Sequence, residues 1–318
     1  MRNILSIDGG GIKGYIPLRI LSYIEKKTNV HISDLFDYFS GVSAGSIIIS
    51  LILMKNNDGS QLYNCDEIIK IFINQMQKTF TKSNVITENL NGLFGTKYNS
   101  KVYEQHLIEH FKQIKLNDLL KPCTFISYSL TTNRPYYFNS LNDPNVYLTD
   151  IIRASSAALT ILDPLNFNNH ILIDGGLITN NPVEICFYDA SEYYNNFDPN
   201  KTFYTLSLAC GFSTIDYNND DPLKNGYLFW TDHLDKLTMS GHYGSEDYVL
   251  KIIDKFCPGN ISKRINIPIG NKTIDILDIS NLKILIDIMD QWISENTNML
   301  DKICEDLLIN YLNNKLST

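Results

Sequence analysis

Near its N-terminus the chain carries a short apolar run that ends in a glycine-rich turn, Ile4-Leu5-Ser6-Ile7-Asp8-Gly9-Gly10-Gly11-Ile12-Lys13-Gly14. Pro17 and apolar residues at helical spacing follow, so this part of the sequence predicts a strand, a turn and a helix. A turn of this kind points several backbone N–H groups at one place, where they can stabilise negative charge. Gly9, Gly10 and Gly11 are therefore candidate donors of an oxyanion hole.

The same order recurs at Gly41-Val42-Ser43-Ala44-Gly45. We expect residues 35–39 to form the strand before this turn and residues 44–54 to form the helix after it. Glycine at positions 41 and 45 permits a sharp turn that lifts the Ser43 hydroxyl above the sheet. Ser43 is the candidate nucleophile, and its context after a first glycine turn makes this short motif more specific than it is alone.

A third glycine element, Asp174-Gly175-Gly176, follows the apolar run 170–173. If that run is a strand, Asp174 lies at the strand end, which is the usual place for a reactive group in an open parallel sheet. Asp174 is the candidate general base. The alternative interpretation is structural, with the Asp174 carboxylate capping the turn through Leu177 and Ile178.

Apolar runs typical of strands alternate with amphipathic runs typical of helices up to residue 209. The expected strands are 3–7, 35–39, 124–130, 170–173 and 203–209, and the expected helices are 17–27, 44–54, 66–78, 100–112 and 182–194. This alternation predicts a layered α/β fold with a mostly parallel sheet. From Ile279 onward, apolar residues at steps of three and four predict two amphipathic helices. We expect a core at residues 1–215 and a helical C-terminal extension at 216–318 that packs on it, together forming one structural domain.

The composition is typical of a globular protein. The chain has 318 residues, of which 44% are hydrophobic and 19% are charged, and its formal net charge is -8. This charge argues against a nucleic-acid partner, and no polybasic segment would draw the chain to anionic lipids, so any membrane contact must be local and apolar. The six cysteines include no Cys-x-x-Cys pair, which predicts reduced, buried thiols rather than a zinc site or a disulfide framework.

The sequence predicts neither a membrane span nor a secretory signal. The longest apolar run, 47–54, is far shorter than the ~20 residues that cross a bilayer. The glycine turn begins too early for a cleavable leader to precede it, so we expect a cytoplasmic protein that meets membranes only at their surface. The segment 81–97 is polar except for Leu93 and Phe94 in its middle. It is either a lid that dips into lipid or an ordinary surface loop whose apolar side chains pack back onto the core.

Four blocks of the sequence together resemble the patatin-like phospholipases. In the family's order they are residues 8–14, residues 41–45, Arg153-Ala154-Ser155-Ser156-Ala157-Ala158 and Asp174-Gly175-Gly176-Leu177-Ile178-Thr179-Asn180-Asn181-Pro182. The resemblance implies that Ser43 matches the family's serine and Asp174 its aspartate, and that Gly9, Gly10 and Gly11 match its oxyanion-hole glycines. It implies a supporting motif role for a further set of residues: Lys13, Gly14, Gly41, Gly45, Gly175 and Gly176.

Membership of this family would imply a three-layer α/β/α sandwich and a calcium-independent lipid acyl hydrolase of the phospholipase A or lysophospholipase type, with no metal or other cofactor. Asp174 would take the proton of Ser43, the serine oxygen would attack a fatty-acyl ester, and water would later release the acyl-enzyme. The implied partners are a phospholipid or another lipid ester and, transiently, a membrane or micelle surface. The head group, the acyl position, any activator and the oligomeric state stay open.

Three positions depart from the family's pattern. Lys13 stands where many members carry arginine, which keeps the positive charge but loses the two-pronged guanidinium and puts any anion-positioning role in doubt. Leu159 replaces a frequent proline, and Ala209-Cys210 replaces a usual Gly-Thr pair. Neither of the last two touches the expected chemistry. Past Phe212 the resemblance ends.

Three other interpretations remain. Ser43, Asp174 and either His233 or His242 follow the Ser, Asp, His order of an α/β-hydrolase triad, although Ser43 comes earlier in the chain than that fold's nucleophile normally does. Residues 9–14 also satisfy the Gly-x-Gly-x-x-Gly pattern of dinucleotide-binding proteins, although no acid ends the second expected strand. A lipid-binding module that carries these motifs without catalysis is the non-enzymatic alternative.

Overall fold

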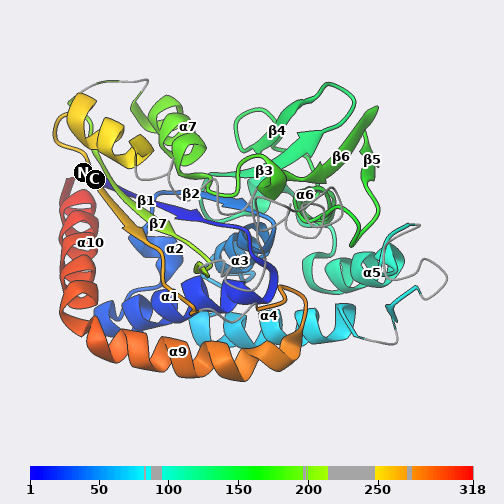
Figure 1. Cartoon of the computed structure of the whole chain (residues 1–318). Helices are drawn as coiled ribbons and strands as arrows, with labels where there is room; N and C mark the ends of the chain where they lie inside the picture. The colour runs from blue at the N-terminus through cyan, green and yellow to red at the C-terminus, as the bar shows by residue number, and fades with distance from the viewer. Residues whose placement is uncertain are drawn as a thin grey trace, which may run out of the picture.

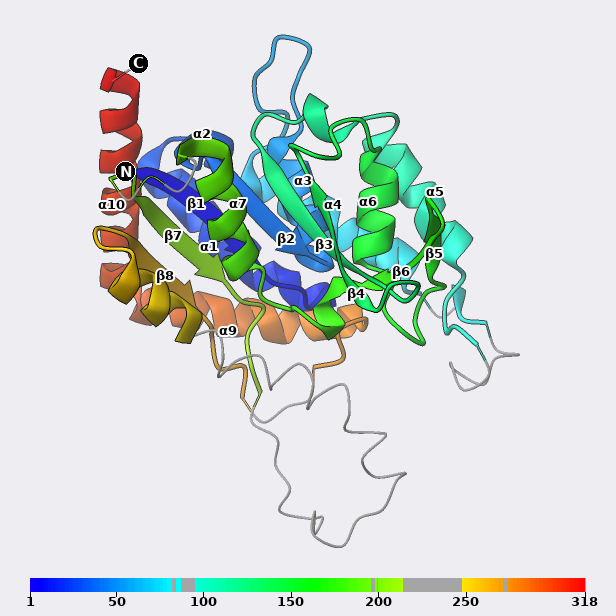
Figure 2. The same ribbon diagram turned by 90° about the horizontal axis from the view of Figure 1, so that it is seen from above.

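The computed structural model describes residues 1–81, 84–86, 95–195, 198, 200–213, 248–270 and 274–317. These residues build one mixed sheet of eight strands in the order β5-β6-β3-β2-β1-β7-β8, with β4 paired to β3 (Figures 1 and 2). The strands are β1 (Arg2–Ile7), β2 (Tyr38–Val42), β3 (Cys123–Ser129), β4 (Arg134–Asn139), β5 (Leu165–Phe167), β6 (His170–Asp174), β7 (Phe203–Leu208) and β8 (Ile261–Ile265).

The sheet has a parallel part and an antiparallel part. Strands β8, β7, β1, β2 and β3 pair in parallel, whereas β4, β5 and β6 join through antiparallel pairs. Ile7 at the end of β1 pairs with Gly41 near the end of β2, so the two glycine-rich turns leave the sheet side by side. Because reactive groups gather where parallel strands end, this edge is the expected place for a site.

Helices cover both faces of the sheet, which confirms the predicted layered α/β fold. In Figure 1, α7 (Val183–Asn195) and the helix 248–256 lie on one face, while α1 (Tyr15–Thr28), α3 (Ala44–Leu53) and α4 (Cys65–Thr79) lie on the other. The two helices expected near the C-terminus are α9 (Leu282–Glu295) and α10 (Thr297–Ser317), which wrap around the outside of α1. The shorter or peripheral helices are η1 (Gly11–Gly14), α2 (Ile32–Leu35), α5 (Ser100–Phe111), η4 (Leu116–Asp118), α6 (Leu148–Ser155), η5 (Gly175–Leu177) and η6 (Ile279–Asn281).

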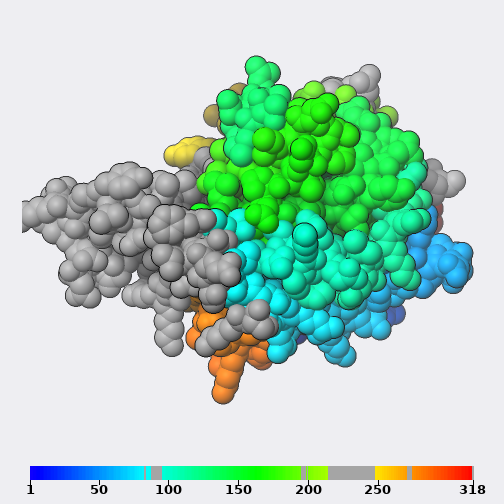
Figure 3. All heavy atoms as spheres, turned by 90° about the vertical axis from the view of Figure 1, so that its right-hand side faces the viewer, coloured from blue at the N-terminus to red at the C-terminus, as the bar shows by residue number. Residues whose placement is uncertain are grey.

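The buried side chains of β1 alternate between the two helical layers, as a strand with both faces covered requires. Leu5 and Ile7 belong to the large apolar core on the side of α1 and α3. Ile4 points to the opposite side, where it packs with Cys186 and Ala190 of α7. The core therefore lies on both faces of the sheet. Figure 3 shows the side of the molecule that α5 and the antiparallel strands build, in cyan and green.

Several segments differ from the expectation, and the strands β4 and β5 and the helix α6 were not among the expected elements. The strand expected at 35–39 begins three residues later, because Ile32–Leu35 forms the short helix α2 and the strand runs on, wholly buried, through Tyr38–Val42. The region expected to be a helical extension also contributes a strand, since β8 extends the sheet beside β7. The alternating pattern of β8 is half exposed and hence weak in the sequence. The expected division at residue 215 lies outside the described residues.

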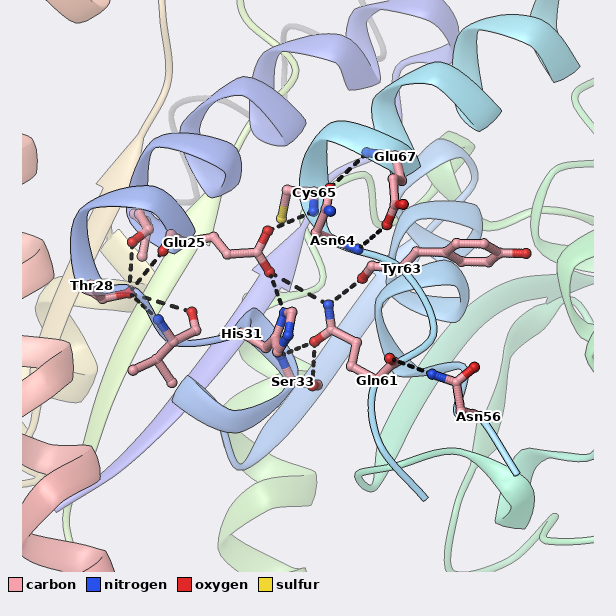
Figure 4. Close-up of polar contacts among 12 residues, drawn as sticks. Glu25, Thr28, His31, Ser33, Asn56, Gln61, Tyr63, Asn64, Cys65 and Glu67 are labelled. Atoms are coloured by element: carbon pink, nitrogen blue, oxygen red, sulfur yellow. Dashed lines mark hydrogen bonds and ion pairs between the residues drawn. The ribbon is translucent and has the colours of Figure 1, made fainter. Parts of the chain in front are cut away.

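A polar network fastens the helices at the edge where β2 begins (Figure 4). Glu25 near the end of α1 accepts a hydrogen bond of 2.7 Å from the backbone N–H of Cys65 at the start of α4 and lies 3.1 Å from His31 Nδ1. Asn64 and Glu67 form a reciprocal capping box at the same helix start. The bond from Cys65 to Glu25 therefore connects the start of α4 to α1, and the capping box closes the first turn of α4.

Two further predictions can be compared with the described residues. All six cysteines have free thiols, and five of them are buried, which confirms the prediction of reduced, buried cysteines. Burial raises the pKa of the Cys123 thiol to about 12, so this thiol stays protonated and inert. Among the helices described, none combines the length and the apolar character that a bilayer crossing needs. The centre of the segment 81–97, with Leu93 and Phe94, lies outside the described residues.

Candidate active site

Ser43 sits on a strained turn between β2 and α3. Its backbone has φ 53° and ψ -120°, a conformation that residues other than glycine rarely adopt and that recurs at functional sites. A Cβ at Gly45 would lie 2.3 Å from the carbonyl oxygen of Ile7, and one at Gly41 would lie 2.7 Å from the backbone of Gly45. Both glycines are thus required by the close approach of β1, the turn and α3, as the nucleophile motif predicts.

Hydrogen bonds hold this turn from two sides. The backbone N–H of Ser43 donates to Ser155 Oγ at 2.9 Å, and Ser155 Oγ donates in turn to the carbonyl oxygen of Ile126 at 2.6 Å. The hydroxyl of Ser46 donates to the carbonyl oxygen of Ser43 at 2.6 Å. Ser155 belongs to the third block of the resemblance, for which the sequence suggested no role. Its position links α6 and β3 to the serine turn.

Asp174 meets Ser43, as expected from the sequence. Ser43 Oγ donates a 2.7 Å hydrogen bond to Asp174 Oδ2, and the N–H of Gly176 donates to Asp174 Oδ1 at 2.7 Å. The carboxylate therefore both caps the turn η5 and contacts the serine, so the two interpretations of Asp174 do not exclude each other. Gly175 is needed here because a Cβ would lie 2.6 Å from the carbonyl oxygen of Ile126.

The surroundings of Asp174 favour its neutral form. Burial raises the pKa of Asp174 to about 6, and the hydrogen bonds from Ser43 and Gly176 oppose this rise. Desolvation dominates because few charges lie close enough to stabilise the carboxylate. At neutral pH the group is mainly ionised, yet it is a stronger base than an ordinary aspartate.

No described histidine donates to or accepts from Ser43 or Asp174. The ring nitrogens of His31, His106 and His170 contact Glu25, Thr79 and Ser129, respectively. His233 and His242, the histidines of the alternative triad, lie outside the described residues.

The glycine turn after β1 lies against the serine. A Cβ at Gly9 would be 3.0 Å from Ser43 Cβ, so the glycine turn and Ser43 lie within contact distance. The N–H of Gly9 donates to the carbonyl oxygen of Asn180 at 3.3 Å. The N–H groups of Gly10 and Gly11 have no hydrogen-bond acceptor within the part of the protein that the structure describes.

The other predicted motif residues support this turn. The backbone N–H of Lys13 donates to the carbonyl oxygen of Gly10 at 3.1 Å, which closes η1. A Cβ at Gly14 would lie 2.8 Å from the ring of Phe72, and one at Gly176 would lie 3.0 Å from Asp174 Oδ1. Their small size lets α4 and the Asp174 loop approach the site.

Asn180 is a site residue to which the sequence assigned no role. Its side chain is 2% exposed, and its Nδ2 donates to the carbonyl oxygen of Gly9 at 3.3 Å, reciprocating the bond from Gly9 to its own backbone. The signal was present, because Asn180 stands six residues after Asp174 in the fourth block of the resemblance. This residue connects the glycine turn after β1 with the loop that carries Asp174.

Three exposed apolar side chains border Asp174. Leu177 and Ile178 follow it in the chain and are 37% and 41% exposed. Leu159, which is 46% exposed, lies two residues after Ala157, whose carbonyl oxygen accepts from the Asp174 N–H at 2.9 Å. We call Leu159, Leu177 and Ile178 the apolar rim.

Described residues include no group of three or more histidines, cysteines, aspartates and glutamates arranged to hold a metal ion.

Comparison with known proteins places these features in a family. A model of the family described as "Patatin-like phospholipase" matches residues 5–187. Patatin-like protein 2 of rice (Oryza sativa subsp. indica) is 27% identical over 267 residues, covering 72% of this chain and 66% of the rice protein. Patatin-T5 of potato (Solanum tuberosum) is 27% identical over 285 residues, covering 79% of this chain and 72% of the potato protein.

Among solved structures, VipD from Legionella pneumophila aligns with a TM-score of 0.42 at 12% identity, covering 91% of this chain and 67% of VipD. The chain spans slightly less than two thirds of the rice relative's length. The family match covers more than half of the chain and includes both glycine turns, Ser43 and Asp174. The chain belongs to the patatin-like phospholipase family.

Proposed function

We propose that this protein is a lipid acyl hydrolase in which Ser43 and Asp174 form a catalytic dyad. The observation that carries the proposal is the 2.7 Å hydrogen bond from Ser43 Oγ to Asp174 Oδ2 on a strained turn. A serine bonded directly to a base is the arrangement that activates a hydroxyl for attack. The family match supports a phospholipase A or lysophospholipase type of reaction.

The reaction proceeds through an acyl-enzyme. As the Ser43 oxygen attacks the ester carbonyl, its proton passes to the Asp174 carboxylate and the carbonyl oxygen becomes an oxyanion. Asp174 then gives that proton to the departing alcohol oxygen, which leaves the acyl group on Ser43. A water molecule loses a proton to Asp174 and attacks the acyl-enzyme, and the fatty acid leaves as Ser43 is reprotonated.

The backbone amides of Gly10 and Gly11 stabilise the oxyanion in this proposal, since neither has an acceptor among the described residues. Gly9 shapes the turn against Ser43, because its own amide already donates to Asn180. Loss of one oxyanion donor typically costs ~100- to 1000-fold in rate. Such donors compensate for the weakness of a carboxylate base compared with imidazole.

A lipid ester is the substrate class that the surroundings favour. The apolar rim is exposed: Leu177 and Ile178 belong to the loop that follows Asp174, and Leu159 follows the segment whose Ala157 carbonyl accepts from Asp174. Exposed apolar side chains beside a catalytic group suit acyl chains or the surface of a membrane or micelle. Substrate would then reach Ser43 from a lipid surface rather than from free solution.

The proposed steps use a carboxylate, a hydroxyl and backbone amides, so we propose that the reaction needs no calcium. The test measures fatty-acid release from phosphatidylcholine vesicles and from a short-chain nitrophenyl ester, each in excess EDTA and in calcium. Wild type is compared with Ser43→Ala, Asp174→Asn and Ser50→Ala. Ser50 is the matched control because it is a buried serine of α3, the helix that follows Ser43, and its hydroxyl has no partner among the described residues.

We expect release by wild type and Ser50→Ala in EDTA and none above background by Ser43→Ala. Full activity of a folded Ser43→Ala protein would overturn the proposed nucleophile. Activity only in calcium would overturn the calcium-independent mechanism. If wild type releases fatty acid from neither ester, the proposed hydrolase function is wrong for these substrates and the lipid-binding alternative gains support.

A further inference from the structure

Asp8, the residue just before the glycine turn, is fixed by an arginine of β8, the edge strand that lies two places from β1 in the sheet. Arg264 of β8 donates from Nη1 to Asp8 Oδ1 at 2.9 Å and from Nη2 to Asp8 Oδ2 at 2.6 Å. Both side chains are buried, with exposures of 6% for Arg264 and 1% for Asp8. A two-pronged bond of this kind sets the orientation of the carboxylate as well as balancing its charge.

The same guanidinium reaches the loop that follows Asp174. Arg264 Nη1 donates to Ser207 Oγ at 2.6 Å, and Ser207 Oγ lies 3.3 Å from Asn181 Oδ1, which it donates to. Asn181 Oδ1 also accepts from the N–H of Val183 at the start of α7. Arg264 therefore connects the end of β1, strand β7 and the segment after the Asp174 turn through buried hydrogen bonds.

A second contact from the same part of the chain holds the glycine turn from outside. The carbonyl oxygen of Ile276 accepts a 2.7 Å hydrogen bond from the N–H of Ile12. It is also so close to Gly11 that a Cβ there would lie 2.2 Å from it. Both Arg264 and Ile276 lie beyond residue 187, where the match to the family model ends.

The charge of Asp8 makes its pairing important for the proposed chemistry. Without the Arg264 charge, the carboxylate next to Gly9 would repel more strongly the oxyanion that forms at Gly10 and Gly11, and low-dielectric surroundings would strengthen this repulsion. Removing one partner of a buried ion pair also leaves the other charge buried without that partner, which disturbs the local backbone.

We propose that Arg264 is a positioning residue for the oxyanion hole. It neutralises Asp8 and, together with the Ile276 carbonyl, holds the glycine turn so that the Gly10 and Gly11 amides face the ester oxygen. Arg264 acts through Asp8 and not on the substrate. This inference rests on the proposed hydrolase function and assigns part of the active site to the C-terminal region.

The kinetic test compares full-length Arg264→Gln, Arg264→Lys and Lys263→Gln with wild type on a soluble nitrophenyl ester. Lys263 is the matched control because it precedes Arg264 on β8 but its side chain is exposed. We expect Arg264→Gln to lower kcat about ten- to hundredfold with little change in KM, as a displaced catalytic group does. Arg264→Lys keeps the charge but cannot form the two-pronged bond, so its kcat should lie between those of wild type and Arg264→Gln. The kcat of Lys263→Gln should match that of wild type.

A charge-balanced variant separates the electrostatic role from simple loss of stability. Asp8→Asn combined with Arg264→Gln has lost both buried charges, so we expect it to recover part of the kcat that Arg264→Gln loses. A purely structural role would make the double variant at least as slow as the single one. That result, or equal kcat for Arg264→Gln and Lys263→Gln, would overturn the inference.

A second readout needs no activity and thus separates this inference from the proposed function. In protein labelled with carbonyl carbon-13 and nitrogen-15 only in glycine, an HNCO spectrum shows amides that directly follow another glycine, which are Gly10, Gly11 and Gly176. We expect the Gly10 and Gly11 signals to shift in Arg264→Lys and in Arg264→Gln but not in Lys263→Gln. Unshifted Gly10 and Gly11 signals in both Arg264 variants would overturn the inference even if wild type proves inactive.

Discussion

The hydroxyl of Ser43 and the carboxylate of Asp174, 131 residues apart in the chain, lie 2.7 Å from each other in the folded protein. Ser43 reaches this position on the turn after β2, and Asp174 on the last residue of β6. The two strands are not neighbours, because β3 lies between them and pairs with both. The contact therefore depends on the register of three strands, and small shifts in that register would break it.

The first prediction concerns pH. Because Asp174 must be ionised to accept the serine proton, activity should rise as this carboxylate loses its own proton. Its pKa is raised to about 6 by burial, so kcat/KM should increase with pH through about 6 and level off above it. An ordinary aspartate would give a midpoint near ~4.

This profile is measured with the soluble ester between pH 4 and pH 9, with a blank lacking enzyme at every pH. Circular dichroism at the acid end shows whether the protein is still folded there. A midpoint below pH 4.5 in folded protein would contradict a desolvated Asp174 base.

The second prediction concerns stability. Since the folded-state pKa of Asp174 is raised from 3.8 to about 6, its contribution to stability is complete below about pH 4 and is lost as the pH rises through about 6. Asp174→Asn removes the desolvated charge. Relative to wild type, the free energy of unfolding of this variant should rise by on the order of 2 kcal/mol between pH 4 and pH 8, while the variant loses activity.

Urea unfolding of both proteins at the two pH values measures this difference. Comparing the unfolding free energy of each protein at pH 4 with its own value at pH 8 cancels the effect of the hydrogen bond lost in Asp174→Asn. An Asp174→Asn protein whose stability relative to wild type is the same at pH 4 and pH 8 would show that the carboxylate is not destabilised by burial.

Much of this site could be predicted from the sequence because its signals are local. Strained or crowded turns require glycine, so Gly9–Gly11, Gly41, Gly45 and Gly175 mark where the backbone approaches other groups. Asp174 stands at a strand end, and the short apolar run before it gave that strand its approximate bounds. The partners of the oxyanion turn are different, because they depend on pairing across the sheet.

Arg264 illustrates that limit. It is one of two consecutive basic residues on a half-exposed edge strand, and nothing in the neighbouring residues indicates that it bonds Asp8, 256 positions earlier. Ser155 likewise contacts Ser43 only because α6 packs on β3. The expected strand at 35–39 begins three residues before β2 because Leu35 and Phe36, at the end of α2, are apolar and buried as strand residues are.

The third prediction separates backbone strain from crowding at the oxyanion turn. Gly11 and Gly59 both have positive φ, 55° and 83°, but a Cβ at Gly11 would lie 2.2 Å from the Ile276 oxygen whereas a Cβ at Gly59 would meet nothing within 4 Å. Gly59→Ala should cost about 1 kcal/mol of stability and leave kcat unchanged. Gly11→Ala should cost more and lower kcat at least ~100-fold, because the turn must move away from Ile276.

Thermal unfolding and ester kinetics on the same two proteins provide the comparison. Equal losses of stability with full activity in both variants would mean that the Ile276 contact does not shape the glycine turn.

The last prediction concerns the apolar rim. Replacing Leu159 and Leu177 by serine removes two exposed apolar side chains beside Asp174 without touching the dyad. If substrate arrives from a lipid surface, the double variant should keep its activity on the soluble ester and lose about tenfold or more on phosphatidylcholine vesicles, because apolar contact area drives interfacial binding.

Ile108 of α5 and Leu312 of α10 are the matched control, since they are 53% and 49% exposed and lie on other helices. The Ile108→Ser and Leu312→Ser double variant should hydrolyse both substrates at the wild-type rate, and sedimentation with vesicles should show weaker binding for the rim variant alone. Equal loss on both substrates would assign the rim leucines to the folding of the site, and no loss on vesicles would exclude them from contact with lipid.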